Sequence, residues 1–377
     1  MLADLEELVL CESFSNDHAA VARSAEVVGA QGARLLGAEP ETVVIDGVTH
    51  LRWAFGTPRV LLMGHHDTVW PLGSLRHHPW SVADGIARGP GVLDMKAGLV
   101  QMFHALASLP SPDGVCVLVN GDEEVGSATS RQLIEETARG CVAAFVLEAS
   151  GDEKGALKTA RKGTSRYEVV VRGRAAHAGL EPQKGVNAAV EAAHQVLSIA
   201  GLGASADAVG AAHSALGLAT VTPTLLSAGS TRNTVPALAR VSVDVRAPTA
   251  AAQDRIDELM RGLTARTPGA RLEVLGGRQR PPMEPESSAE LFALTSRLAA
   301  ELGQEPPRGI AVGGASDGNY TAAAGCPTLD GLGAVGGGAH ADTEYVEVAR
   351  MVPRAHLLAQ LITRTRRWPH RDRRGSA

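Results

Sequence analysis

The spacing of apolar residues predicts strands that are buried on both faces within the first 150 residues. Nearly continuous apolar runs bounded by turn residues occupy positions 59–64, 115–121 and 141–148. A strand that is covered on both faces has this pattern because neither face has to be polar. Helical spacing at positions 95–109 and 127–139 separates the runs. The alternation of strand and helix predicts an α/β domain with a mostly parallel sheet flanked by helices.

The pattern changes after about residue 159. Strands are then expected in four places, which are residues 166–171, 216–226, 237–246 and 271–275. Two amphipathic helices are expected at residues 186–200 and 251–266. About four strands with two helices predict an α+β insert rather than a continuation of the first domain.

The rhythm of helix, Gly-rich loop and strand resumes after residue 287, and a helix over residues 348–367 ends it. We therefore expect a discontinuous α/β domain made of residues 1–161 and 281–377. The α+β insert occupies residues 162–280 between the two parts. The basic stretch at residues 364–374 is expected to be a solvated end.

Composition and charge restrict the kinds of partner. The chain has 377 residues, of which 44% are hydrophobic and 20% charged, so it can bury sizeable cores. Its formal net charge of -5 provides no broad basic field for nucleic acid or for a membrane surface. Small molecules are the expected partners, with no nucleic acid and no membrane.

The cysteines and the N-terminus favour a cytoplasmic location. The four cysteines are far apart and match no metal or redox spacing, as buried thiols in a reducing compartment would: Cys11, Cys116, Cys141 and Cys326. The first seven residues carry acids where a secretory signal needs positive charge. No stretch reaches the roughly 20 apolar residues of a membrane span.

Five short segments carry ligands for a hard metal ion at strand ends or in Gly-rich turns. Their candidate side chains are His65, Asp67, Asp94, Glu123, Glu124, Glu148 and His340. Two histidines with several carboxylates and no cysteine are the ligand mixture of a catalytic rather than a structural zinc site. Strand ends of an α/β domain are also where its sites form.

Some of these residues suggest separate roles. His65 and Asp67 are two apart after a buried strand, so Asp67 is placed to orient a metal-binding imidazole; a polar cluster at a strand end is the alternative. Asp94 follows a Gly-Pro-Gly turn and is a candidate for bridging two ions, although an ordinary helix N-cap is the simpler interpretation.

The adjacent carboxylates of Glu123 and Glu124 would repel each other unless a cation offsets them. We expect Glu124 to be a ligand and Glu123 a general base, with an acidic loop as the alternative. Glu148 ends an apolar strand, which is a poor place for a lone charge. His340 lies in a Gly-rich loop that a bound metal would anchor.

At these motifs the chain resembles the M20 family of binuclear zinc metallopeptidases, and within it the glutamate carboxypeptidases of the folate-cleaving carboxypeptidase G type. The motifs are His65-x-Asp67-Thr-Val, Gly-Pro-Gly-x-x-Asp94-x-Lys and Asp-Glu123-Glu124-x-Gly-Ser. The resemblance implies two Zn²⁺, with Co²⁺ as a substitute. It assigns His65 and Glu148 to one ion, Glu124 and His340 to the other, and Asp94 to both. Asp67 would support the site and Glu123 would be the base.

The resemblance also implies that the insert is a lid and dimerisation domain of a homodimer. His177, in Gly-Arg-Ala-Ala-His-Ala-Gly, matches a histidine that polarises the scissile carbonyl, usually across the dimer. Asn233 matches an asparagine that contacts substrate. Without the resemblance we would interpret both as loop or turn residues.

Three cations match the family's substrate pocket. Arg280 matches an arginine that receives the substrate carboxylate, Arg246 a second arginine nearby, and Lys154 a lysine that meets a glutamate side chain. In isolation each would be interpreted as a surface residue. The chain departs from the folate-cleaving relatives in a shorter loop from Glu148 to Lys154, and in Met95 where those usually have a second aspartate.

The expected activity is hydrolysis of an amide bond that releases a C-terminal glutamate-like amino acid from a peptide, folate-like or N-acyl compound. The nearest alternative is an N-acyl-amino-acid deacylase of the acetylornithine or succinyl-diaminopimelate type, or another M20 dipeptidase. A metal-free binding protein on the same scaffold is the alternative from another class.

Overall fold

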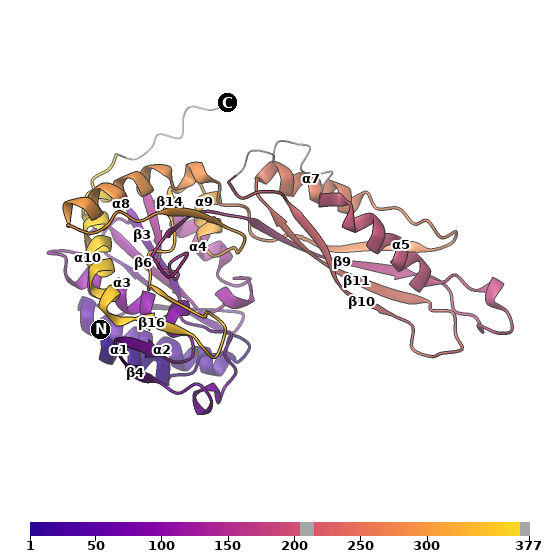
Figure 1. The fold of residues 1–377 in the computed structure, drawn as a ribbon, viewed down its shortest axis with the longest axis horizontal. Coiled ribbons are helices and arrows are strands. Elements are labelled where there is room, and N and C mark those ends of the chain that lie inside the picture. The colour runs from indigo at the N-terminus through magenta and orange to yellow at the C-terminus, as the bar shows by residue number, and fades with distance from the viewer. Residues whose placement is uncertain (204–214, 370–377) are drawn as a thin grey trace. The chain divides into compact units, whose positions relative to one another are not determined.

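A computed structural model of the chain describes residues 1–203 and 215–369 (Figure 1). The chain divides into two compact units. Unit 1 contains residues 1–160, 283–312 and the segment from Ser316 onward, and unit 2 contains residues 161–282 and 313–315. Residues 370–374 of the basic end lie outside the described residues.

A six-stranded sheet forms the centre of unit 1. Its strand order is β1 (Glu41–Ile45), β2 (Val48–Ala54), β6 (Val115–Asn120), β3 (Val60–His65), β7 (Ala143–Val146) and β14 (Thr328–Leu329). β3 pairs in parallel with β6 and β7, and β14 pairs in parallel with β7. The hairpin of β1 and β2 adds an antiparallel edge. The expected α/β fold with a mostly parallel sheet is confirmed.

Both faces of this sheet are covered, which explains the continuous apolar runs. Leu62 belongs to a large core with the helices α1 (Leu2–Leu10), α2 (His18–Leu36), α3 (Ala97–Ala107), α8 (Ala289–Glu301) and α10 (Val348–Thr365). Its neighbours Leu61 and Met63 belong to a smaller core with α4 (Arg131–Ala138) and α9 (Gly318–Ala323). Successive residues of β3 therefore face opposite layers, and all are buried.

Two helices of unit 1 are shorter than the sequence pattern indicates. The pattern starting at residue 95 yields an irregular turn, η2 (Val92–Lys96), before α3. The residue at the N-cap of α3 is Lys96, so the N-cap interpretation of Asp94 is wrong; Asp94 lies two residues earlier, with non-helical backbone angles inside the turn. In the other helix, residues before Arg131 instead form a turn around the Asp122 carboxylate, which accepts hydrogen bonds from Thr129 and Ser130.

Two further small sheets join distant segments of unit 1. A four-stranded sheet has the order β15 (Gly336–Gly337), β16 (Tyr345–Glu347), β5 (Ile86–Arg88) and β4 (Ser81–Ala83). β8 (Leu157–Arg161) pairs with β13 (Gly309–Val312). The first of these sheets brings the returning chain beside the residues that precede Asp94.

Unit 2 is an antiparallel sheet with two helices. The strand order is β10 (Thr220–Ala228), β11 (Leu238–Ala247), β9 (Gly163–Arg172) and β12 (Arg271–Arg278). The helices α5 (Ala188–Ala200) and α7 (Ala250–Arg261) begin at side-chain caps, Asn187 and Thr249, and bury Ile199 and Ile256 in the unit's core. In this part of the chain the four expected strands and two expected helices are all present.

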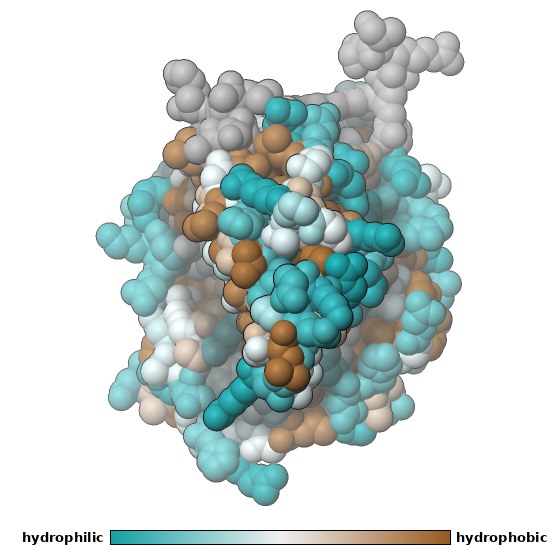
Figure 2. Space-filling view, turned by 90° about the vertical axis from the view of Figure 1, so that its right-hand side faces the viewer, coloured by the Kyte–Doolittle hydropathy of each residue, from teal (hydrophilic) through white to brown (hydrophobic). Residues whose placement is uncertain are grey.

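In the described part of the chain, the face of the molecule drawn in Figure 2 has no large surface of one kind of residue. Figure 2 shows hydrophobic residues scattered among hydrophilic ones. Exposed leucines of unit 2 include Leu180, Leu197, Leu225 and Leu226. Across residues 1–203 and 215–369, we find no helix with both the length and the apolar character needed to cross a bilayer.

Candidate metal centre

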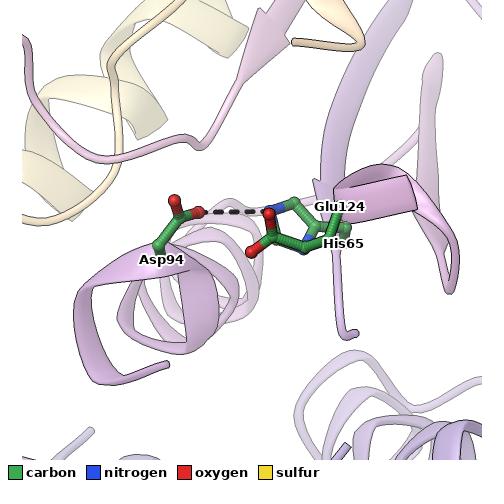
Figure 3. Close-up of side chains that lie close together, drawn as sticks. All are labelled: His65, Asp94 and Glu124. Atoms are coloured by element: carbon green, nitrogen blue, oxygen red, sulfur yellow. Dashed lines mark hydrogen bonds and ion pairs between the residues drawn. The ribbon is translucent and has the colours of Figure 1, made fainter. Parts of the chain in front are cut away.

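The candidate ligands come together at one edge of the unit 1 sheet. His65 ends β3, Glu148 follows β7, and Glu124 lies in the turn η3 (Glu123–Val125) after β6. Parallel strands deliver their carboxyl ends to the same edge, so these three side chains meet there. Asp94 reaches them from η2 and His340 from the loop after β15. In Figure 3 the side chains of His65, Asp94 and Glu124 point toward one another.

Asp94 lies between two histidines. Its Oδ1 is 3.2 Å from His65 Nε2, and its Oδ2 is 3.2 Å from His340 Nε2. Each histidine faces one further carboxylate: His65 Nε2 is 3.7 Å from Glu148 Oε1, and His340 Nε2 is 3.4 Å from Glu124 Oε1. The site thus contains two sets of one histidine and one glutamate, and the two sets share one aspartate.

These distances suit a pair of metal ions. Ligands that lie 2.0–2.2 Å from a tetrahedral ion are about 3.3–3.6 Å apart, which is close to the spacing within each set. Ligand atoms of His65, Asp94 and Glu124 all lie within 4.8 Å of one another, as do those of His65, Glu123 and Glu148. Glu124 Oε1 is buried and makes no hydrogen bond of acceptable geometry. The histidines and carboxylates of this site therefore fit the pair of metal ions that the sequence predicts.

The pKa values of the site reflect its several buried carboxylates and the two histidines beside them. Burial raises the pKa of Glu124. Burial also raises that of Asp94, but hydrogen bonds from His340 and His65 outweigh it and the net shift is downward. The adjacent carboxylates of Asp94 and Glu124 raise the pKa of His340 to about 10. In the metal-free protein protons on histidine offset part of the negative charge that metal ions would otherwise offset.

Asp67 contacts both the His65 ring and the turn that carries Glu123 and Glu124. Its buried carboxylate accepts hydrogen bonds from Ser15 Oγ at 2.7 Å and from the backbone N–H groups of Glu123 and Glu124, both at 3.2 Å. His65 Nδ1 is 3.0 Å from the Asp67 carbonyl oxygen and 3.4 Å from its Oδ1. Asp67 thus orients the His65 ring and holds the turn that carries both glutamates.

His66 faces the other way. It is buried, and its Nε2 donates to the Thr49 carbonyl oxygen at 3.0 Å. Burial lowers the pKa of His66 to about 4, so the ring is neutral at pH 7. Its role is structural.

Three further residues of the site carry no signal as ligands in the sequence. Lys158 Nζ lies 3.8 Å from Glu148 Oε2. Met95 Sδ accepts a hydrogen bond from the backbone N–H of His65 at 3.3 Å. Glu344 is fully buried and accepts hydrogen bonds from the backbone of the Asp94 turn. Only an apolar partner at residue 95 could have been suspected from the sequence, since the other two residues have no distinctive spacing.

The predicted substrate residue of unit 1 lies in a different cavity. Lys154 is exposed and lines a cavity of about 410 Å³ together with Arg308, Arg350 and Arg354. None of the five predicted metal ligands lines that cavity. Arg350 donates to the Lys154 carbonyl oxygen at 3.0 Å and so fixes the loop after Glu148.

Four predicted residues belong to unit 2. His177 Nδ1 accepts the N–H groups of Gly179 and Leu180, at 3.2 and 3.1 Å, so the neutral ring carries its proton on Nε2 and can donate from there. The Ala178 N–H donates to the Asn233 carbonyl oxygen at 2.8 Å, which brings the segments of His177 and Asn233 together.

The two arginines of unit 2 differ in their surroundings. Arg280 is 9% exposed, and Gln253 Nε2 donates to its carbonyl oxygen at 3.0 Å. Arg246 donates from Nε and Nη2 to the two carboxylate oxygens of Asp244, at 2.9 and 3.2 Å. Asp244 thus occupies the two N–H donors of Arg246 that would otherwise bind a substrate carboxylate.

The chain is similar to known proteins in sequence and in fold. The family model described as peptidase family M20/M25/M40 matches residues 61–364. The chain is 31% identical to carboxypeptidase G2 of Pseudomonas sp. (strain RS-16), covering 96% of this chain and 88% of that protein. It is 27% identical to succinyl-diaminopimelate desuccinylase of Acidiphilium cryptum (strain JF-5), over 90% of this chain and 92% of that one. The fold is similar to an M20 family metallo-carboxypeptidase of Sulfolobus solfataricus, with a TM-score of 0.76, 16% identity and coverage of 97% and 99%.

Proposed function

The chain belongs to peptidase family M20/M25/M40, and from this premise we propose that it is a binuclear zinc carboxypeptidase. The proposed reaction releases a C-terminal glutamate-like amino acid from a peptide, folate-like or N-acyl compound. The observation that carries the proposal is the pair of histidine–glutamate sets that share Asp94. A structural site would not need five ligands with such a shared carboxylate, whereas a two-metal hydrolase does.

In the proposed site His65, Glu148 and Asp94 would hold one ion, and His340, Glu124 and Asp94 would hold the other. The ions, when bound, lower the pKa of water and polarise the substrate carbonyl. Glu123 is buried to 7% exposure beside His65 and Glu148. It accepts a proton from the attacking water and delivers that proton to the leaving nitrogen. His177, with its proton on Nε2, donates a hydrogen bond to the carbonyl oxygen.

The preference for a glutamate-like product rests on the similarity to carboxypeptidase G2, which covers most of both chains. Arg280 and Asn233 are the proposed substrate contacts in unit 2. Arg246 would have to exchange its Asp244 partner for a substrate carboxylate, and Lys154 would have to reach out of its own cavity. A succinyl-diaminopimelate desuccinylase is the second candidate, because a desuccinylase also matches over most of its length.

We further propose that unit 2 forms a homodimer and that the protein works in the cytoplasm. β10 is an edge strand that carries the exposed Leu225 and Leu226, and both features suit pairing with a second copy. Cys11, Cys116, Cys141 and Cys326 are all free thiols, as a reducing compartment allows.

A substrate panel tests the proposed specificity. Protein reconstituted with Zn²⁺ or Co²⁺ is assayed with folate, N-benzoyl-glutamate, N-acetylornithine, N-succinyl-diaminopimelate and dipeptides. We expect the highest kcat/KM for the glutamate conjugates. A preference for succinyl-diaminopimelate or acetylornithine would replace the carboxypeptidase assignment with a deacylase. An Asp94→Ala preparation purified in parallel controls for contaminating hydrolases.

A further inference from the structure

Glu344 is a buried carboxylate four residues after His340, and its hydrogen-bond partners are backbone groups and an indole rather than the candidate ligand side chains. It is 0% exposed. Its Oε1 accepts the backbone N–H groups of Leu93 and Asp94, at 2.8 and 3.0 Å. Its Oε2 accepts the N–H of Gly91 at 3.1 Å and the indole N–H of Trp70 at 2.9 Å. One side chain therefore receives four hydrogen bonds.

All four partners are N–H donors, so Glu344 acts as an ionised carboxylate, which only accepts. Three of the donors belong to the turn before α3, where the backbone is irregular: Gly91 has φ +69° and Asp94 has non-helical angles. A turn of this shape leaves its N–H groups without helical partners. Glu344 supplies the acceptors that such buried N–H groups need.

Glu344 joins three segments that each carry a residue of the metal centre. Trp70 lies three residues after Asp67, the turn contains Asp94, and Glu344 itself follows His340. His340 is at φ +64° with a side chain that is 48% exposed, so neighbouring core packing does little to fix it. The hydrogen bonds from the Asp94 turn tie the loop of His340 to the carboxylate that both histidines face.

We infer that Glu344 is a positioning residue that holds the bridging Asp94 in register with His340. The inference rests on the proposed metal pair and is independent of which substrate is cleaved. Because Asp94 contributes to both metal sets, the loss of Glu344 weakens the binding of both ions together. A residue that supported one ligand alone would weaken one ion only.

The test is Glu344→Gln in the full-length, metal-loaded protein. Glutamine keeps the size of the side chain but places an NH₂ group against two of the N–H donors. Metal release is followed by competition with a chromophoric chelator, and the Co²⁺-loaded protein is examined by visible absorption, which reports ligand geometry without substrate. We expect affinity to fall about 10- to 100-fold for both ions and the cobalt spectrum to change.

Glu191→Gln is the matched control. Glu191 on α5 is also 0% exposed and accepts backbone N–H groups from Arg266 and Thr267 and a side-chain N–H from Gln195, but it belongs to unit 2. It should lose comparable stability in urea while keeping wild-type metal affinity and cobalt spectrum. If both variants lose metal equally, general destabilisation explains the effect and the inference is wrong.

Trp70→Phe covers the case in which Glu344→Gln does not fold. It removes one of the four hydrogen bonds and keeps an aromatic ring, so we expect a smaller weakening of both ions in the same direction. Wild-type metal affinity in Trp70→Phe and in any folded Glu344→Gln would overturn the inference while leaving the proposed function intact. Wild-type protein that binds no metal would instead overturn the proposed function.

Discussion

His340 Nε2 and Asp94 Oδ2 are 3.2 Å apart although 246 positions separate the two residues in the chain. The contact completes a centre whose other candidate ligands all come from the first 148 residues. Asp94 also contacts His65 through its second oxygen. The two candidate metal positions therefore share a residue, and their occupancies should depend on each other.

Substitution of the ligands should separate shared from individual roles. Asp94→Ala should lose both metal ions, whereas His65→Ala and His340→Ala should each lose one ion and weaken the other. Metal content per chain, measured by elemental analysis after gel filtration in metal-free buffer, distinguishes these outcomes. An Asp94→Ala protein that retains one full equivalent would show that the carboxylate does not bridge. A wild-type stoichiometry near zero would favour a metal-free binding protein.

Metal binding should release protons at neutral pH. The pKa of His340, raised to about 10 by its carboxylate partners, means that the metal-free protein holds a proton there at pH 7. A metal ion binds the neutral imidazole, so that proton must leave and apparent affinity should rise with pH, about tenfold per unit for each proton released. The protonated His340 also stabilises the metal-free fold. This contribution is complete below the ordinary histidine pKa and is lost as the pH rises toward 10.

Calorimetric titration with Zn²⁺ in buffers of different ionisation enthalpy measures the number of protons. A His340→Ala variant should release fewer protons than the wild type at pH 7. Equal release from both proteins would assign the protons to other groups.

Glu123→Gln should abolish turnover without removing metal. Glutamine cannot accept the proton of the attacking water, and loss of a general base costs about 10²- to 10⁴-fold in rate. The measurement is kcat on the best substrate of the panel, together with metal content. Glu136→Gln on the exposed face of α4 is the control and should keep wild-type kcat. A metal-loaded Glu123→Gln protein with normal turnover would remove Glu123 from the mechanism.

Gly98→Ala should destabilise unit 1 beneath Glu148. A Cβ at residue 98 would lie 2.0 Å from the Leu147 carbonyl oxygen, so α3 could not approach the end of β7 as it does. Alanine is intrinsically better in a helix by about 1 kcal/mol, so a net loss would report the clash itself. We expect the free energy of unfolding to fall by about 1–3 kcal/mol.

Urea unfolding measures this change, with Gly29→Ala in α2 as the control. The nearest atom to a Cβ at residue 29 is 3.4 Å away, so that substitution should be neutral or stabilising. If Gly98→Ala is as stable as Gly29→Ala, the close approach of α3 to β7 is not required.

The strands and helices were largely predictable because burial on both faces leaves a direct trace in the sequence. β3 and β6 follow continuous apolar runs, and the alternation in β11 follows from one covered face. The start of α3 was not predictable from periodicity, because the hydrogen bonds from Leu93 and Asp94 to Glu344 determine it over a separation of about 250 positions. Local patterns cannot report a partner that distant.

The candidate site was predictable where the residue type is unusual for its place. Glu148 places a charge directly after an apolar run, and Glu123 and Glu124 place two acids side by side. Both arrangements are destabilising unless a cation is nearby, so the sequence alone suggests a functional role. Lys158 carries no such signal, since a lysine in a short strand is ordinary and only the fold sets its ammonium beside Glu148.

The split of unit 1 around its insert also orders events during protein synthesis. His340 emerges from the ribosome 192 residues after Glu148, which at 5–20 residues per second is a delay of about 10–40 s. Throughout that interval the nascent chain presents Asp94, Glu124 and Glu148 without their second histidine or the Glu344 carboxylate that braces the turn. In the proposed metal centre, complete loading with metal must therefore wait until His340 and Glu344 have left the ribosome.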